Sequence, residues 1–263
     1  MKQPMNTQTP KESSQAHWEE IYSRMQGAYG LYGFQEQIVE AIITHAQPIE
    51  EAAILEIGFG KGNELLQLRA AGAVCTGLDF SSVAIRMFME RVAGSDADIR
   101  VIRADARRVP LREDVFDAVF SQGVLEHFHD PEALLREQYR VLKSGGIMLI
   151  EVPNRWTTYT VYKHLLMSVG KWGPGWEKSF SPRELSRLVE SLGFETIAFY
   201  GWDSLSAKVL RKLLQVLGRR QTMHSRRMRG FRHAIEQNPV LRWFFLSLII
   251  VARKPATAAG ARP

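Results

Sequence analysis

The sequence has one cysteine, Cys75, so no disulfide can form within the chain. It also has little continuous apolar sequence: the most apolar stretch, residues 241–251, is interrupted by Arg242. A membrane-spanning helix needs roughly 20 apolar residues. Residues 1–20 are polar and lack the apolar core of a secretion signal. These absences exclude a disulfide-stapled domain and a spanning helix, and they predict a cytoplasmic location.

Acidic residues are scarce relative to basic ones in only one segment of the chain, residues 203–240. The chain carries 34 lysine and arginine residues against 28 acidic ones, a net charge of 34 − 28 = +6. Residues 203–240 alone hold nine lysine or arginine residues and two acids, which gives 9 − 2 = +7 and leaves −1 for the rest. A basic surface therefore belongs to this segment and not to the whole fold.

Short apolar runs alternate with helical patterns along most of the chain. Runs of this kind are typical of buried strands in parallel βαβ units with right-handed crossovers. The expected strands are residues 52–57, 74–78, 99–103, 115–120, 147–152, 194–200 and 244–252. The pattern predicts an α/β fold with a doubly wound, mostly parallel, seven-stranded sheet.

The composition predicts one domain with three additions. Residues 1–12 are expected to be disordered and residues 13–263 to form the domain. The additions are two glycine-broken helices at 13–46, an aromatic segment at 154–180 and a basic helical insertion at 203–240 before the last strand. No internal repeat is visible.

A glycine-rich turn follows the first expected strand directly. Gly58, Gly60 and Gly62 come after Glu56, at the point where a helix begins. Glycine allows a tight turn and lets a ligand approach the backbone without interference from Cβ. The dehydrogenase pattern would need glycine in place of Asn63, and the P-loop pattern would need serine or threonine in place of Gly62. Both common nucleotide-binding patterns are therefore disfavoured.

Two acids follow the next two strands at the same sheet edge. Asp79 lies 79 − 58 = 21 residues after the first glycine, where a carboxylate can accept hydrogen bonds from both hydroxyls of a ribose. Asp105 follows the third strand. Alone it would be interpreted as a turn-capping residue, but beside Asp79 and the glycine loop it favours an adenine contact.

These segments resemble the motifs of class I S-adenosylmethionine-dependent methyltransferases, and within them the small-molecule enzymes of methyltransferase type 11. The resemblance covers about residues 50–200 and implies the Rossmann-like methyltransferase fold with S-adenosylmethionine as cofactor. It is carried by residues 54–62 (ILEIGFGKG), 77–81 (GLDFS), 104–106 (ADA), 116–120 (FDAVF), 124–128 (VLEHF) and 142–146 (LKSGG).

The resemblance implies a role for each matched position. Glu56 and the three glycines would surround the methionine part of the cofactor, with Gln122 nearby. Asp79 would hold the ribose, and Asp105 with the backbone amide of Ala106 would read the adenine. The helices before the first strand would cover the cofactor, which makes lid candidates of His17, Trp18, Tyr22 and Tyr29. Aromatic residues packed on a helix face are an equally good interpretation of these four.

Methyl transfer needs alignment and a deprotonated acceptor more than it needs a strong acid. His127, in the loop after the fourth strand, is the candidate base, and the alternative is a histidine that only ties this loop together. Alignment alone, with no base, is a third option. The aromatic segment adds Trp156 and Tyr159 as candidates for binding a flat or apolar acceptor, against the alternative of a packed connector.

Several reactions are disfavoured by what the sequence does not contain. Methylation of exocyclic amines on nucleobases usually carries an Asn/Asp/Ser-Pro-Pro-aromatic motif after the fourth strand, where this chain reads SQGV at residues 121–124. Methylation of pyrimidine C5 needs a cysteine nucleophile, and Cys75 falls within the second expected strand. No cysteine and histidine residues have the spacing of a zinc site, so no metal is expected.

The basic insertion leaves the partner open. Apolar residues at helical spacing over 205–217, with cations opposite them, suit contact with an anionic membrane surface. The arginine residues could instead bind nucleic acid. The third alternative is a helix packed on the core whose basic face is only exposed to solvent. The first hypothesis is methyl transfer to a small lipid-like or aromatic acceptor at or near a membrane, with oxygen as the expected acceptor atom. The second is an RNA or protein methyltransferase that grips its substrate through residues 203–240. The third is a non-catalytic module that binds S-adenosylmethionine. The sequence predicts no oligomeric state.

Overall fold

The computed structural model describes residue 12 and residues 14–24, 35–202 and 246–256. Tyr29 and the basic insertion at 203–240 lie outside the described residues, as does most of the expected disordered start. Glu12, the last residue of that start, is described, and its carboxylate lies 3.2 Å from the guanidinium of Arg107.

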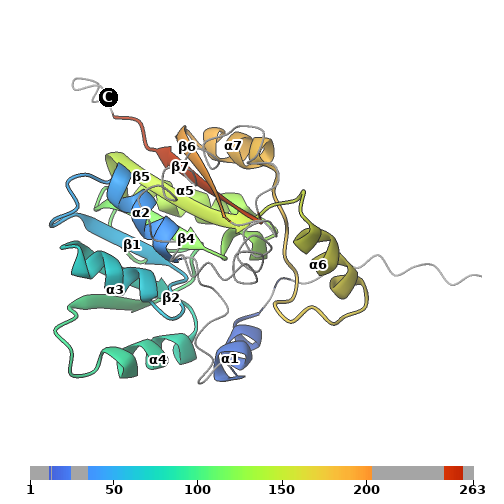
Figure 1. The fold of residues 1–263 in the computed structure, drawn as a ribbon. Helices are drawn as coiled ribbons and strands as arrows, with labels where there is room; N and C mark the ends of the chain where they lie inside the picture. Colours follow the sequence, from blue (N-terminus) through green and yellow to red (C-terminus); the bar gives the residue numbers. More distant parts are fainter. Residues whose placement is uncertain (1–11, 13, 25–34, 203–245, 257–263) are drawn as a thin grey trace, which may run out of the picture.

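One seven-stranded sheet forms the centre of the described part of the chain (Figure 1). The strand order is β3-β2-β1-β4-β5-β7-β6, and only β7 runs antiparallel to its neighbours. The strands are β1 (Ala53–Ile57), β2 (Val74–Asp79), β3 (Ile99–Arg103), β4 (Phe116–Gln122), β5 (Leu142–Pro153), β6 (Glu195–Trp202) and β7 (Ser247–Arg253). The predicted fold class, a doubly wound and mostly parallel sheet, is confirmed.

Helices begin where the sequence supplies caps. The side chains of Ser81 and Ser181 accept hydrogen bonds from backbone amides three residues on, at 3.1 and 3.2 Å, and Asp130 caps its helix with proline at the first position. The helices are α1 (Gln15–Arg24), α2 (Gln35–His45), α3 (Asn63–Ala70), α4 (Ser82–Val92), the 3₁₀ turn η1 (Leu125–His127), α5 (Pro131–Val141), α6 (Thr158–Ser168) and α7 (Pro182–Glu190).

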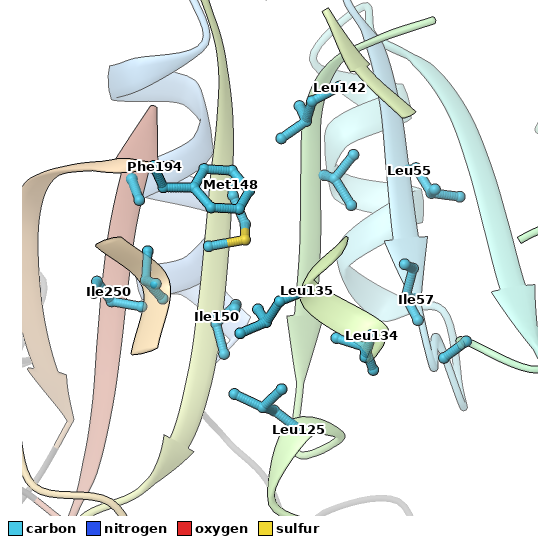
Figure 2. Packing of buried hydrophobic residues seen from close by; sticks show 14 of the residues in the cluster. Leu55, Ile57, Leu125, Leu134, Leu135, Leu142, Met148, Ile150, Phe194 and Ile250 are labelled. Atoms are coloured by element: carbon cyan, nitrogen blue, oxygen red, sulfur yellow. The ribbon is translucent and has the colours of Figure 1, made fainter. Parts of the chain in front are cut away.

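The sheet is apolar on both faces, and each face has its own core. Leu55 and Ile57 of β1 pack with residues of α5 and α7 on one face; Figure 2 shows Leu134 and Leu135 of α5 near this part of the sheet and Phe194 beside Met148 of β5. Residues of α2, α3 and α4 cover the other face. Burial on both faces explains why the strand sequences are continuously apolar and do not alternate.

Two elements differ from the expectation. Strand β5 begins at Leu142 and not at residue 147, because Leu142 pairs with Phe116 and an irregularity before Ala118 accommodates the early start. Helix α6 lies within the aromatic segment at 154–180, for which no helix was expected. Thr157 caps this helix, and its hydroxyl accepts a hydrogen bond from the Thr160 amide at 3.1 Å.

Candidate active site

A cavity opens at the carboxyl ends of the strands, where an open parallel sheet binds its ligands. It brings together seven of the residues predicted from the sequence: Trp18, Tyr22, Gly58, Asp79, Ala106, Gln122 and His127. Much of the remaining wall is apolar, with Phe80, Val124 and Phe128 among the lining residues. The cavity therefore combines a few convergent polar groups with aromatic walls, as small-molecule sites do.

The glycine loop between β1 and α3 is closely packed on its outer side. Gly58 has φ +74°, and a Cβ there would lie 2.4 Å from a methyl carbon of Val124. Gly62 has φ +63°, and a Cβ there would lie 2.3 Å from the ring of Phe88. A side chain at either position would need both a strained backbone and displaced neighbours. Both positions of the turn therefore require glycine.

Asp79 ends β2 with its carboxylate at the floor of the cavity. One oxygen accepts a hydrogen bond from the Gly60 amide at 3.0 Å, and the other accepts one from the Ser81 amide at 2.9 Å. Burial raises the pKa of Asp79 although these amides oppose the rise. A carboxylate has about four lone-pair directions, so Asp79 could accept hydroxyl donors from a ligand in addition to its backbone partners.

Glu56 lies beneath the glycine loop and is 2% exposed. Its Oε2 atom is buried with no hydrogen-bond partner in the structure. Burial and the nearby charges of Glu64 and Asp79 raise the pKa of Glu56 well above its usual range. A buried carboxyl in this state favours a cationic ligand, because a positive charge would both fill the open acceptor and stabilise the ionised form.

Helix α1 covers one side of the cavity and is fixed there by Glu19, a residue that sequence reasoning missed. Its carboxylate accepts hydrogen bonds from the hydroxyls of Ser81 and Ser82, at 2.7 and 2.9 Å. The backbone amides of Ser82 and Val83 donate two more, at 2.8 and 2.9 Å. Burial raises the pKa of Glu19, but these hydrogen bonds outweigh it and lower the pKa from 4.5 to about 2. Glu19 thus joins the lid helix to the N-terminus of α4.

Replacing Glu19 by alanine is expected to lower the free energy of unfolding by about 0.5–2 kcal/mol, the cost of losing a helix cap. The folded-state pKa lies below the unfolded value, so this stabilisation is present above pH 4.5 and is lost as the pH falls toward 2. Urea unfolding at several pH values measures both effects. Glu20→Ala, one position along the same helix, is the matched control, and equal losses in the two variants would contradict the anchoring role.

Of the two residues expected to contact adenine, only Ala106 lines the cavity. Ala106 lines the cavity, whereas the Asp105 carboxylate lies 2.7 Å from the Arg107 guanidinium and outside the cavity lining. Hydrogen bonds from Arg107 lower the pKa of Asp105. Contact between Asp105 and adenine stays a prediction, and it requires that carboxylate to turn away from Arg107.

His127 lies in η1 and lines the cavity opposite Asp79. Its Nδ1 atom is 3.1 Å from the carbonyl oxygen of Trp176, and its ring meets the Trp18 ring edge-on at 4.9 Å. A carbonyl can only accept, so Nδ1 carries the hydrogen and Nε2 keeps its lone pair. Burial lowers the pKa of His127, although the charge of Glu177 and the Trp176 carbonyl oppose the shift. The imidazole is therefore a neutral proton acceptor near pH 7.

Three further carboxyls lie behind His127: Glu126, Glu151 and Glu177, called here the acidic group. Burial and the charges of its two partners raise the pKa of Glu126 well above the usual range, and its Oε2 is buried without a hydrogen-bond partner. Burial raises the pKa of Glu151 to about 7. Glu151 pairs in register with Gln122. Sequence reasoning missed all three, although acids next to two strand ends were a usable signal.

The other predicted acceptor residues lie elsewhere. Trp156 is 58% exposed and is not part of the cavity lining. Tyr159 packs edge-on against Trp172, with ring centroids 5.7 Å apart. Gly60 and Gly62 shape the loop without lining the cavity, and Glu56 lies below it. The roles of Trp156 and Tyr159 in acceptor binding stay predictions that this arrangement does not support.

Comparisons with known proteins agree on the class. The methyltransferase domain family matches residues 55–150. The chain is 30% identical over 175 residues to the demethylmenaquinone methyltransferase of Corynebacterium urealyticum, covering 60% of this chain and 72% of that protein. It is 30% identical over 159 residues to the ubiquinone biosynthesis O-methyltransferase of Methylobacterium nodulans, covering 57% and 62%.

Two further proteins similar to this chain are named for other substrates. The chain is 28% identical over 154 residues to the tRNA U34 carboxymethyltransferase of Citrifermentans bemidjiense, covering 55% of this chain and 47% of that protein. The fold matches that of a phosphoethanolamine N-methyltransferase from Haemonchus contortus, solved with S-adenosylhomocysteine, with a TM-score of 0.61, 21% identity and coverage of 90% and 57%.

The chain belongs to the class I S-adenosylmethionine-dependent methyltransferases. It is an enzyme, and its cofactor is S-adenosylmethionine. The residues present fit this group. Asp79 lines the cavity with a carboxylate that suits ribose hydroxyls, and the unpartnered Oε2 of Glu56, a residue outside the cavity lining, would suit an ammonium.

Neither a membrane-spanning helix nor a metal-binding cluster is found in the described ranges. No helix there combines the length and the apolar character that crossing a membrane requires. The same ranges contain no group of three or more histidine, cysteine, aspartate or glutamate side chains placed to hold a metal ion.

Proposed function

We propose that the enzyme transfers a methyl group to an oxygen of a small, lipid-like or aromatic acceptor, with His127 as the proton acceptor. The observation that carries this proposal is the geometry of His127. Its Nδ1 is occupied by the Trp176 carbonyl at 3.1 Å, its Nε2 is left to accept, and its side chain lines the cavity that holds the cofactor residues. Bound S-adenosylmethionine supplies an electrophilic methyl group with a good leaving group.

The protein's own residues would then do three things. Glu56 and Asp79 hold the cofactor at its ammonium and ribose ends. Trp18 and Tyr22 exclude water from one side, held in place by Glu19. His127 removes a proton from the acceptor hydroxyl, which makes the oxygen a better nucleophile.

An oxygen acceptor of apolar or aromatic character fits this cavity best. A hydroxyl needs a base near neutral pH, which a neutral imidazole provides. The aromatic wall formed by Trp18, Phe80 and Phe128 suits a flat or apolar body. The relatives include enzymes named for quinone biosynthesis, and one of these names specifies O-methylation.

Replacing His127 by glutamine is expected to lower kcat by about 100-fold or more, with a much smaller change in cofactor affinity. His164→Gln, an exposed histidine on α6, is the matched control. The assay follows methyl transfer to phenolic and catechol acceptors, with primary amines tested in parallel. Equal turnover in wild type and H127Q would remove His127 from the site, and turnover on amines alone would overturn the oxygen assignment.

The pH profile separates His127 from Glu151 as the base. The reactive form is the deprotonated one in both cases, so activity falls as the pH drops through the pKa of the base. Burial lowers the pKa of His127 below 6.5, whereas burial raises that of Glu151 to about 7. We expect an acid limb in kcat below pH 6.5. A limb near pH 7 that disappears in Glu151→Gln would assign the proton transfer to Glu151.

RNA is the second candidate acceptor, and it has two supports. One relative is named as a tRNA-modifying enzyme, and residues 203–240 carry a net charge of 9 − 2 = +7. Replacing Arg226, Arg227 and Arg229 by glutamine separates the candidates. Loss of RNA retention with the loss of transfer to RNA would favour this second function. Unchanged small-molecule turnover in the same variant favours the first.

A further inference from the structure

Helix α6 carries a patch of exposed apolar side chains that no part of the cofactor site uses. Seven large apolar residues are exposed in the described part of the chain, and five of them lie within residues 156–169. These five, called here the α6 face, are Val161 (71%), Tyr162 (57%) and Leu165 (63%) on α6, Val169 (57%) directly after the helix and Trp156 (58%) two residues before it. Figure 1 shows α6 at the margin of the molecule, apart from the helices that cover the sheet.

The outward direction of this face is fixed by a buried ion pair on the other side of the helix. Lys163 is fully buried, and its Nζ lies 2.8 Å from the Glu177 carboxylate and 2.5 Å from the Ser179 hydroxyl. At roughly 100° per residue, Val161, Leu165, Val169 and Tyr162 fall within an arc of about 100°, and Lys163 points about 150° away from its centre. The helix therefore cannot rotate its apolar side inward without breaking this pair.

The surroundings of the face are positively charged. Residues 154–176 contain no aspartate or glutamate, and they include Arg155, Lys163 and Lys171. Lys163 is neutralised by Glu177, while Arg155 and Lys178 share the single carboxylate of Glu184 at 2.7 and 2.9 Å. Arg155 adjoins Trp156, Lys171 lies two residues after Val169, and the set of Arg155, Lys171, Lys178 and Glu184 has a net charge of 3 − 1 = +2.

We propose that the α6 face docks on the surface of an anionic lipid bilayer. An amphipathic helix with aromatic and aliphatic residues on one side and cations at its margin has the chemistry of an interfacial membrane contact. Trp156 and Tyr162 pair an apolar ring with a polar atom, which suits the boundary between headgroups and acyl chains. A second copy of the chain on the same face would bring like charges together, whereas anionic headgroups complement them.

The position of α6 gives this docking a consequence. The helix follows β5, and β5 is the neighbour of β4, whose end carries Gln122 at the cavity. A bilayer held by α6 would lie near the carboxyl edge of the sheet, on the side of the molecule where an apolar acceptor enters. The docking surface is argued from exposure and charge alone and does not depend on the proposed oxygen acceptor.

The test is cosedimentation with vesicles of phosphatidylcholine, with and without phosphatidylglycerol. Val161→Ser with Leu165→Ser is expected to lower partitioning onto the anionic vesicles by at least about tenfold. The matched control is Val74→Ser with Met89→Ser, which removes two exposed apolar side chains elsewhere, and it should change partitioning by less than about twofold. Both pairs are also made with Arg226, Arg227 and Arg229 replaced by glutamine, so that residues 203–240 do not mask the effect.

A second measurement reports insertion directly. Brominated lipids should quench part of the tryptophan fluorescence in wild type, and Trp156→Phe should remove that part. The proposal is overturned if the wild-type chain does not bind anionic vesicles, or if the α6 and control pairs bind equally. It is also overturned if light scattering shows a wild-type dimer that the α6 pair converts to a monomer, which would assign the face to a second copy.

Discussion

Replacing Asp79 by alanine is expected to weaken the binding of S-adenosylmethionine by roughly 10- to 150-fold. The variant removes a carboxylate that could accept ribose hydroxyls at the floor of the cavity, and a hydrogen bond to a charged group contributes about 1.5–3 kcal/mol. Titration calorimetry with S-adenosylmethionine and with S-adenosylhomocysteine measures the change directly. Both ligands share the ribose, so both affinities should fall by a similar factor.

The same carboxylate also accepts the amides of Gly60 and Ser81, so the variant needs a structural control. Asp79→Asn keeps the shape and one acceptor oxygen, but its amide nitrogen cannot accept the second backbone amide, so it should lose affinity together with some stability; circular dichroism checks that each variant is folded at the temperature of the titration. Asp96→Ala, on the loop before β3, serves as the matched control for a lost carboxylate. Unchanged affinity in a folded Asp79 variant would contradict the assignment of the ribose site.

Replacing Lys163 by methionine is expected to lower the free energy of unfolding by about 3–5 kcal/mol. Lys163 and Glu177 are 0% and 5% exposed, and removing one member of a buried pair leaves the other charge uncompensated. Glu177 also accepts a hydrogen bond from the Trp172 indole at 3.2 Å, so the loss would reach the whole connection after α6. Urea unfolding gives the size of the effect, and hydrogen exchange shows whether it is centred on α6.

A second replacement tests the cause. Glu177→Gln in the Lys163→Met background removes the unpaired charge but keeps an acceptor for Trp172, so most of the lost stability should return. Lys171→Met, an exposed lysine three residues past α6, should change the free energy of unfolding by less than about 0.5 kcal/mol. A loss below about 1 kcal/mol in Lys163→Met would show that the pair does not hold α6 in place.

The sheet was predictable because each of its strands is marked by local sequence. Continuous apolar runs such as residues 53–57 and 147–152 signal strands buried on both faces, and Ser81, Asp130 and Ser181 mark helix starts within a few residues. The glycine loop and Asp79 were also found, since both follow strands directly. Local signals of this kind survive because the parallel sheet buries every central strand in the same way.

The lid helix was expected from the resemblance, but the contacts that hold it and the burial of nearby charges could not be predicted because they depend on residues distant in sequence. Glu19 reads as one more acid on an amphipathic helix, and only the fold brings it to Ser81, 62 positions away. Lys163 carries no sign of burial in the sequence, and only the fold places it against Glu177. Trp156 lies outside the cavity, in a segment whose aromatic residues were expected to cover the acceptor.

Transfer of labelled methyl groups tests whether the acceptor is a small, lipid-like or aromatic molecule. Purified enzyme is incubated with methyl-labelled S-adenosylmethionine and a cell lysate, and the label is then sought in the organic extract, the RNA and the protein. The account predicts label in the organic extract, with much less in the Asp79→Ala and His127→Gln variants. Label confined to RNA or protein would contradict it, and would make residues 203–240 the grip on a macromolecular substrate.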